Sequence, residues 1–159
     1  MKFNNTIKLI VSIAISEAAG VIGSLFTTSA IPIWYADLQK PALNPPGWIF
    51  GPVWTILYLL MGISLFLVWR RGTENKDART AIVLFAAQLI LNAFWTIIFF
   101  GLHNPALAFV EIVVLLAAII WTTVLFYKIS RVAGILLLPY ILWVSFAAYL
   151  NFAIWQLNR

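Results

Sequence analysis

The residues of this chain best suited to chemistry are tryptophans and amides set at helical spacing. Gln88, Asn92 and Trp95 fall at positions i, i+4 and i+7, so they share one face of a helix. Trp54 and Trp143 lie inside two other apolar stretches, away from their ends. Indoles with a few polar groups are typical of cavities that hold small, mostly apolar ligands. The sequence therefore predicts a cavity walled in part by Trp54 and Trp143.

Conventional catalytic groups are scarce. The chain has no cysteine, which excludes disulfides and thiolate chemistry, and its single histidine, His103, cannot build a metal site alone. Glu17 lies in the middle of an apolar stretch, where an ionisable group is a functional-site hypothesis, with a neutral packing role as the alternative. Glu111 follows the helix-start signal of Asn104 and Pro105, and we interpret it as structural. We expect no metal site.

The composition is that of a membrane protein. Of the 159 residues, 64% are hydrophobic and only 9% are charged, whereas about 25% are charged in soluble domains. The net charge of +5 does not indicate a nucleic-acid partner, because the basic residues fall at the edges of apolar stretches. Membrane lipid is the expected surrounding partner.

Five apolar stretches are each long enough to cross a bilayer, which takes about twenty residues. They cover residues 7–26, 51–69, 80–100, 106–127 and 133–157. None alternates with the period of two that a membrane barrel requires. The sequence predicts an all-α integral membrane protein, with a single domain over residues 1–159 that forms a five-transmembrane-helix bundle. We interpret the first stretch as a span, with a cleaved signal peptide as the alternative.

The basic residues predict an orientation. One side of the expected bundle carries eight of them: Lys2, Lys8, Arg70, Arg71, Lys76, Arg79, Lys128 and Arg131. The other side carries only Lys40 and Arg159. Since cytoplasmic loops are enriched in Lys and Arg, the N-terminus is expected on the cytoplasmic side.

Polar and small residues within the spans predict close helix packing. Gln88 and Asn151 are expected either to face the cavity or to hydrogen-bond between helices. Ser12, Ser16 and Gly20 begin a stripe of small residues at four-residue spacing in the first span. Small residues let a second helix approach closely. We interpret the stripe as packing within one chain, and a homodimer is the alternative.

A long loop separates the first two spans. The stretch WYADLQKPALNPPGWIF contains Pro41, Pro45 and Pro46, which fix the backbone and resist helix and sheet. Loops of this length in a compact bundle are usually functional. Residues 29–47 are therefore predicted to form a structured loop that caps the cavity on the side opposite the basic residues.

Four sequence blocks are similar to those of a known family. They are WYADLQKPALNPPGWIFGPVWTILYLLMG, AQLILNAFWTIIFFG, AFVEIVVL and LLPYILWVSFAAYLN, in that order along nearly the whole chain. Together they resemble the translocator-protein family (TspO/MBR), also called tryptophan-rich sensory proteins or peripheral-type benzodiazepine receptors. The short N-terminus, without an Arg/Ser-rich presequence, favours a bacterial cell membrane.

The resemblance implies a receptor or sensor with a ligand pocket under the first loop. Its expected ligands are the tetrapyrroles protoporphyrin IX and haem, and synthetic benzodiazepines and isoquinoline carboxamides. Porphyrin or haem would be a ligand rather than a cofactor, and the protein would regulate porphyrin metabolism or a stress response. The alternatives are light- and oxygen-dependent breakdown of porphyrin, and transport of porphyrin or sterol.

The resemblance also implies which residues bind ligand. They are Tyr35, Pro45, Trp54, Asn92, Trp95, Trp143, Ala147 and Leu150. Trp54 and Trp143 would be catalytic residues only if porphyrin breakdown is real. Sterol is weakly supported, because the last helix lacks a suitably spaced basic residue after Tyr149. Leu125, Tyr127 and Arg131 satisfy a proposed sterol pattern, but on the basic side.

Overall fold

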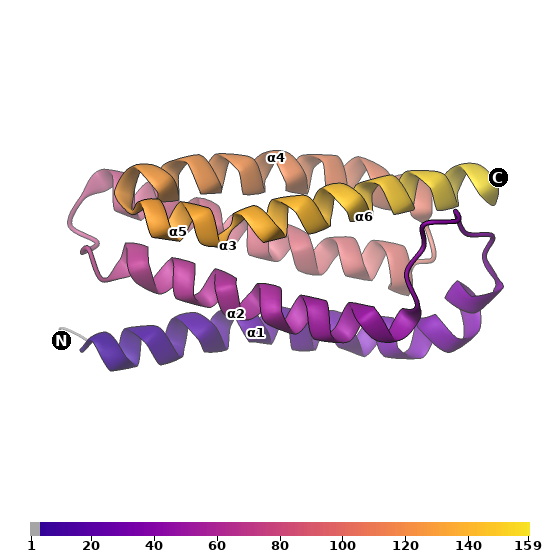
Figure 1. Cartoon of the computed structure of the whole chain (residues 1–159), viewed down its shortest axis with the longest axis horizontal. Coiled ribbons are helices and arrows are strands. Elements are labelled where there is room, and N and C mark those ends of the chain that lie inside the picture. Colours follow the sequence, from indigo (N-terminus) through magenta and orange to yellow (C-terminus); the bar gives the residue numbers. More distant parts are fainter. Residues whose placement is uncertain (1–3) are drawn as a thin grey trace.

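In hydrocarbon the backbone must satisfy its own hydrogen bonds, and this chain does so with helices. The computed structural model describes residues 4–159 (Figure 1). The helices are α1 (Asn5–Ala30), α2 (Phe50–Trp69), α3 (Lys76–Thr96), α4 (Pro105–Ile129), α5 (Arg131–Leu136) and α6 (Leu138–Leu157). With their short extensions they give five spans that are long and apolar enough to cross a membrane: Asn5–Tyr35, Gly47–Trp69, Lys76–Gly101, Pro105–Ile129 and Arg131–Leu157. The predicted fold class is confirmed.

Asparagine side chains cap the N-termini of three of the helices. The Oδ1 atom of Asn4 accepts from the backbone N–H of Ile7 at 2.8 Å, and Asn104 accepts from Leu107 at 3.0 Å. Asn75 does the same for the second residue of α3, at 2.9 Å. Each amide satisfies a backbone donor that the first helical turn leaves without a partner.

The first span is longer than the hydropathy pattern predicts. Residues 29–47 were expected to be loop, but the chain stays helical through a wide π-helical turn, Ile31–Tyr35, and leaves the helix only near Leu38. Pro32 cannot donate a backbone hydrogen bond, and here it widens the helix by one residue instead of ending it. At about 1.5 Å per residue the span is roughly 46 Å long, so it extends beyond the hydrocarbon layer.

The fifth span is broken near its start. Pro139 lies in the first turn of α6, and Leu137 is the single residue between α5 and α6. The Leu137 N–H bonds to the carbonyl of Gly134 at 3.1 Å, a tighter turn than an α-helix has. The Ser64 hydroxyl donates to the carbonyl of Ala133 at 2.7 Å and so ties α2 to α5.

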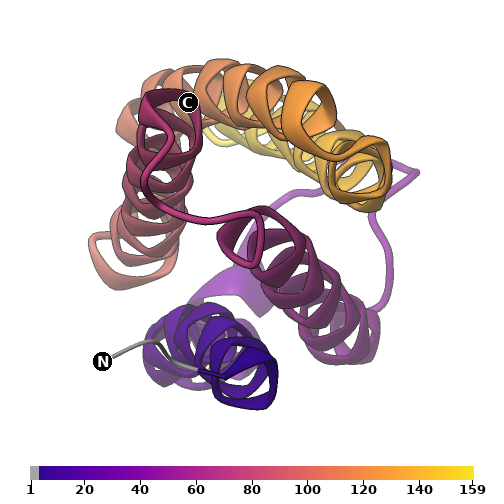
Figure 2. The ribbon, with the colours of Figure 1, turned by 90° about the vertical axis from the view of Figure 1, so that its left-hand side faces the viewer.

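The helices form a ring in the order α1, α2, α5 with α6, α4 and α3 (Figure 2). The first described residues, the α2–α3 turn and the α4–α5 turn lie at one end, which we call the basic end (Figure 1). The first loop and the C-terminus lie at the other, the loop end. Lys2, one of the eight residues used to predict orientation, lies outside the described residues.

The stripe of small residues in α1 packs inside the bundle. Ser12 and Ser16 are fully buried. A Cβ on Gly20 would lie 2.6 Å from the ring of Tyr58, and a Cβ on Gly62 would lie 2.6 Å from the Cα of Ile13. These contacts bring α1 and α2 together within one chain, in agreement with the interpretation of the stripe as intramolecular packing. A homodimer stays a prediction.

Candidate ligand-binding site

A cavity of about 590 Å³ lies between α1, α2, α3 and α6, toward the loop end. This volume falls in the range of small-molecule sites, roughly 300–1,000 Å³. Nine of the residues that line it are aromatic: Tyr35, Trp48, Phe50, Trp54, Tyr58, Trp95, Phe99, Phe100 and Trp143. Polar groups are few, and they include Glu17, Thr96 and Asn151.

Aromatic side chains join α2 to α6 along one wall. Trp54 stacks on Tyr58, with ring centroids 5.5 Å apart, and meets Tyr140 edge-on at 6.2 Å. One turn nearer the loop end, Phe50 meets Trp143 edge-on at 6.1 Å. The backbone of α2 packs on α1 and α5 rather than closely on α6. The large rings therefore bridge two helices that stand apart.

A polar network forms the floor of the cavity. The Tyr58 hydroxyl donates to Oδ1 of Asn92, and Nδ2 of Asn92 donates to the Tyr140 hydroxyl at 2.9 Å. The Tyr140 hydroxyl then donates to Oε1 of Gln88 at 2.9 Å. Tyr58 lines the cavity, while the other three lie beneath it, and all four are buried. The network links α2, α3 and α6 at the level where the cavity ends.

A second network fixes the α3 wall. The indole N–H of Trp95 donates to Oδ1 of Asn151 at 3.0 Å, and Nδ2 of Asn151 donates to the carbonyl of Pro105 at 2.7 Å. Trp95 also stacks on Phe99, with centroids 5.4 Å apart. The orientation of the Trp95 indole is thus set before any ligand arrives.

The first loop, residues 38–46 between the first two spans, is held in place by hydrogen bonds. Tyr35 is 5% exposed and donates to Oδ1 of Asn44 at 2.7 Å. The ammonium of Lys40 lies 4.9 Å from the centre of the Tyr35 ring and donates to two carbonyls of the same segment. Asn158, at the end of α6, receives the N–H of Gln39 at 2.9 Å and donates to its carbonyl at 2.9 Å. The loop is therefore tied both to itself and to the C-terminal helix.

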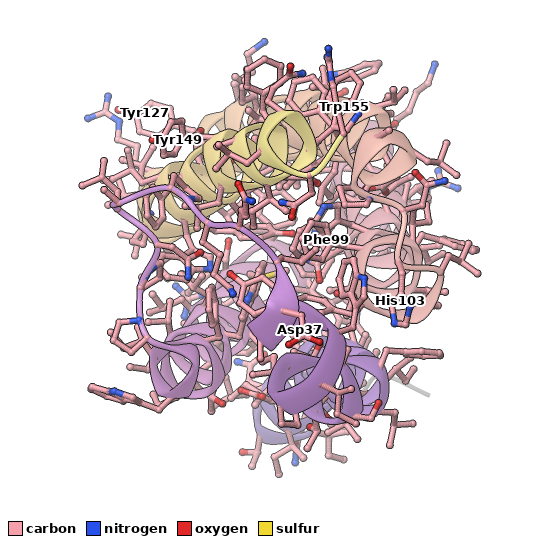
Figure 3. The ribbon with its side chains drawn as sticks, turned by 90° about the vertical axis from the view of Figure 1, so that its right-hand side faces the viewer. Asp37, Phe99, His103, Tyr127, Tyr149 and Trp155 are labelled. Atoms are coloured by element: carbon pink, nitrogen blue, oxygen red, sulfur yellow. The ribbon has the colours of Figure 1, made fainter. Side chains whose placement is uncertain are left out.

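Figure 3 looks onto the loop end, with Phe99 inside the bundle and Asp37 and His103 at its rim. His103 has a positive φ of 52° and is exposed, and its ring stacks on Trp34 at 4.4 Å. Among residues 4–159 no three potential metal-ligating side chains of His, Cys, Asp or Glu come together.

The TspO/MBR family model matches residues 12–156. The chain belongs to the TspO/MBR family. It is 47% identical over 154 residues to the tryptophan-rich protein TspO of Archaeoglobus fulgidus, covering 97% of this chain and 99% of the relative. It is 40% identical over 139 residues to the human translocator protein, covering 87% and 82%. It is 37% identical over 128 residues to the tryptophan-rich sensory protein of Cereibacter sphaeroides, covering 79% and 77%.

The match to the TspO/MBR family includes every residue that lines the cavity, from Glu17 to Ile154. With its five apolar spans, this member of the family is an integral, multi-pass membrane protein.

The structure brings most of the predicted site residues together. Those that line the cavity are Tyr35, Trp54, Trp95, Trp143, Ala147 and Leu150. Two do not. Asn92 belongs to the floor network but does not line the cavity, and it hydrogen-bonds to Tyr58 and Tyr140. Pro45 belongs to the loop and contributes its carbonyl as the acceptor for Nδ2 of Asn44 at 3.1 Å.

Other cavity residues had no place in the predicted site. Phe99 and Phe100 follow Trp95 by about one turn, so helical spacing alone could have indicated them. Glu17 lines the cavity from α1, whereas Glu111 belongs to α4 and does not. The two carboxyl groups therefore do not share this site.

Proposed function

We propose that this chain is a membrane receptor that binds a flat, mostly apolar ligand of the tetrapyrrole class in the aromatic cavity. The observation that carries the proposal is the cavity of about 590 Å³, walled by Trp54, Trp95 and Trp143. Protoporphyrin IX and haem have wide aromatic faces that suit stacking on indoles. Synthetic benzodiazepines and isoquinoline carboxamides are smaller ligands with the same preference.

The polar groups of the site support a ligand with an apolar body and a few acceptors. The indole N–H of Trp143 has no partner among the described residues. Lys40 does not line the cavity, but its ammonium lies 4.9 Å from the ring centre of Tyr35, which does, and it would attract ligand carboxylates from there. The names of two relatives, translocator protein and tryptophan-rich sensory protein, support transport or sensing in those proteins. For this chain we propose sensing, in a bacterial membrane, with the basic end in the cytoplasm.

Titration with protoporphyrin IX in the dark tests the proposal. Purified protein should show saturable quenching of tryptophan fluorescence. Trp54→Ala and Trp143→Ala should each weaken affinity about two- to tenfold, since an aromatic contact contributes about 0.5–1.5 kcal/mol beyond its area. Trp121→Ala is the matched control, because Trp121 is 61% exposed on α4 and lies outside the cavity. Absence of dark quenching, or equal losses in all three variants, would overturn the proposal.

Porphyrin breakdown is a second candidate, favoured by the position of Trp54 and Trp143 in one cavity. Bound porphyrin would absorb light, dioxygen would be the oxidant, and Trp54 or Trp143 would supply electrons. Trp54→Phe and Trp143→Phe keep an aromatic face but remove the indole. Photobleaching of bound porphyrin should then fall while dark affinity is retained. Unchanged photobleaching in both variants would eliminate this candidate.

A further inference from the structure

At the basic end, far from the aromatic cavity, the α4–α5 turn forms a second pocket. Arg71 reaches it from the α2–α3 turn, and Lys128 and Arg131 flank Ser130 within it. Three cationic side chains therefore surround one hollow. Glu74 and Asp77, the described carboxylates of this end, do not line it.

The backbone of the pocket is held by close packing. Ser130 is extended, with φ −149° and ψ 115°, which separates α4 from α5 by one residue. A Cβ on Gly134 would lie 2.5 Å from the Cβ of Tyr127, so α5 folds back directly onto the end of α4. The Ser64 bond to Ala133 anchors the same turn to α2. The fold thus fixes the backbone from which Lys128 and Arg131 extend.

The pocket is polar toward its centre and apolar toward the membrane. Ser130 Oγ accepts from the N–H of Ala133 at 3.4 Å, so its own hydrogen remains free to donate. On the outer side Tyr127, Val132 and Ile135 are each about half exposed. The three cations have no carboxylate partner among residues 4–159. A ligand that fits this arrangement has an anionic head and apolar chains.

We propose that this pocket, which we call the basic elbow, binds the phosphodiester headgroup of an anionic phospholipid. The guanidinium groups of Arg71 and Arg131 and the ammonium of Lys128 would bind phosphate oxygens, and the acyl chains would lie along Val132 and Ile135. Basic pockets between membrane helices on the cytoplasmic side have this preference. The proposal is independent of what the aromatic cavity binds.

Native mass spectrometry of the full chain tests the proposal. The protein is released from detergent with phosphatidylglycerol or with phosphatidylcholine of the same acyl chains, and the fraction carrying one lipid is measured. Phosphatidylglycerol should be retained preferentially. The variant R71Q/K128Q/R131Q should lose the preference, at about fivefold per charge removed, and the single variant R131Q should lose part of it.

The variant R70Q/K76Q/R79Q is the matched control, since it removes the same charge from the same end but outside the pocket. It should keep the preference, and circular dichroism should show equal helicity for all variants. Equal losses in both triple variants would overturn the proposal in favour of diffuse attraction. Competition by inorganic phosphate alone would overturn it in favour of a soluble anion. Competition by cholesterol would favour the sterol pattern of Leu125, Tyr127 and Arg131.

Discussion

The floor of the cavity allows the energetic role of one amide to be isolated. Asn92 is 1% exposed and makes one hydrogen bond to Tyr58 and one to Tyr140. Asn92→Leu keeps a similar volume but removes both bonds. Tyr140 still donates to Gln88, whereas the Tyr58 hydroxyl is left without an acceptor. Interhelical hydrogen bonds in membranes contribute about 0.6 kcal/mol on average and up to about 1.7 kcal/mol. We expect Asn92→Leu to lower the free energy of unfolding by about 1–3 kcal/mol.

A double-mutant cycle in an SDS unfolding titration measures the part that belongs to one bond. Asn92→Leu, Tyr58→Phe and the double variant should give a coupling energy of about 0.5–1.7 kcal/mol. Tyr149→Phe is the control partner, because Tyr149 is 45% exposed and its hydroxyl has no hydrogen-bond partner among the described residues. It should not couple to Asn92. A coupling energy near zero for Asn92 and Tyr58, or full stability of Asn92→Leu, would refute the stabilising role of the network.

Two further predictions concern packing and the loop. Gly62→Ala should lower the free energy of unfolding by about 1–3 kcal/mol, because the added Cβ would meet the backbone of Ile13. Gly51→Ala is the control and should be neutral, because nothing lies within 4 Å of its Cβ position. SDS titration of both variants checks this, and equal stability of the two would contradict the close contact at Gly62. Asn158→Leu removes two hydrogen bonds to Gln39. Hydrogen exchange of the Gln39 backbone amide should become about tenfold faster, while the overall free energy of unfolding stays the same. Unchanged exchange would show that other contacts hold the loop.

The five spans could be predicted because the membrane imposes a length and an apolar composition on each of them. The end of the first span could not. Pro32 and the prolines that follow it read as one loop, yet Pro32 only widens a helix that other contacts continue to stabilise. The break at Leu137 was equally hidden, because Pro139 near the start of a long apolar run is compatible with a continuous span.

The candidate site was predictable where residues of one helix share a face. Trp95 and Trp143 satisfy that condition, and the structure places both on the cavity wall. Asn92 shares the face of Trp95, but spacing carries no information on depth, and Asn92 lies in the floor network without lining the cavity. The bond between Gln39 and Asn158 joins residues far apart in the chain, so no local pattern could indicate it.

The cavity follows from a difference in side-chain size along the same helices. Toward the basic end, Gly62 lets α1 and α2 touch, and Gly134 lets α5 fold onto α4. Toward the loop end, the facing positions of α2 and α6 carry Trp54 and Trp143, which hold these helices apart. The Asn92 network lies between these two regions, at Tyr58 of α2, and joins α2, α3 and α6 by hydrogen bonds. Small residues near the basic end and large rings near the loop end therefore explain why the bundle is tightly packed in one half and keeps a cavity in the other.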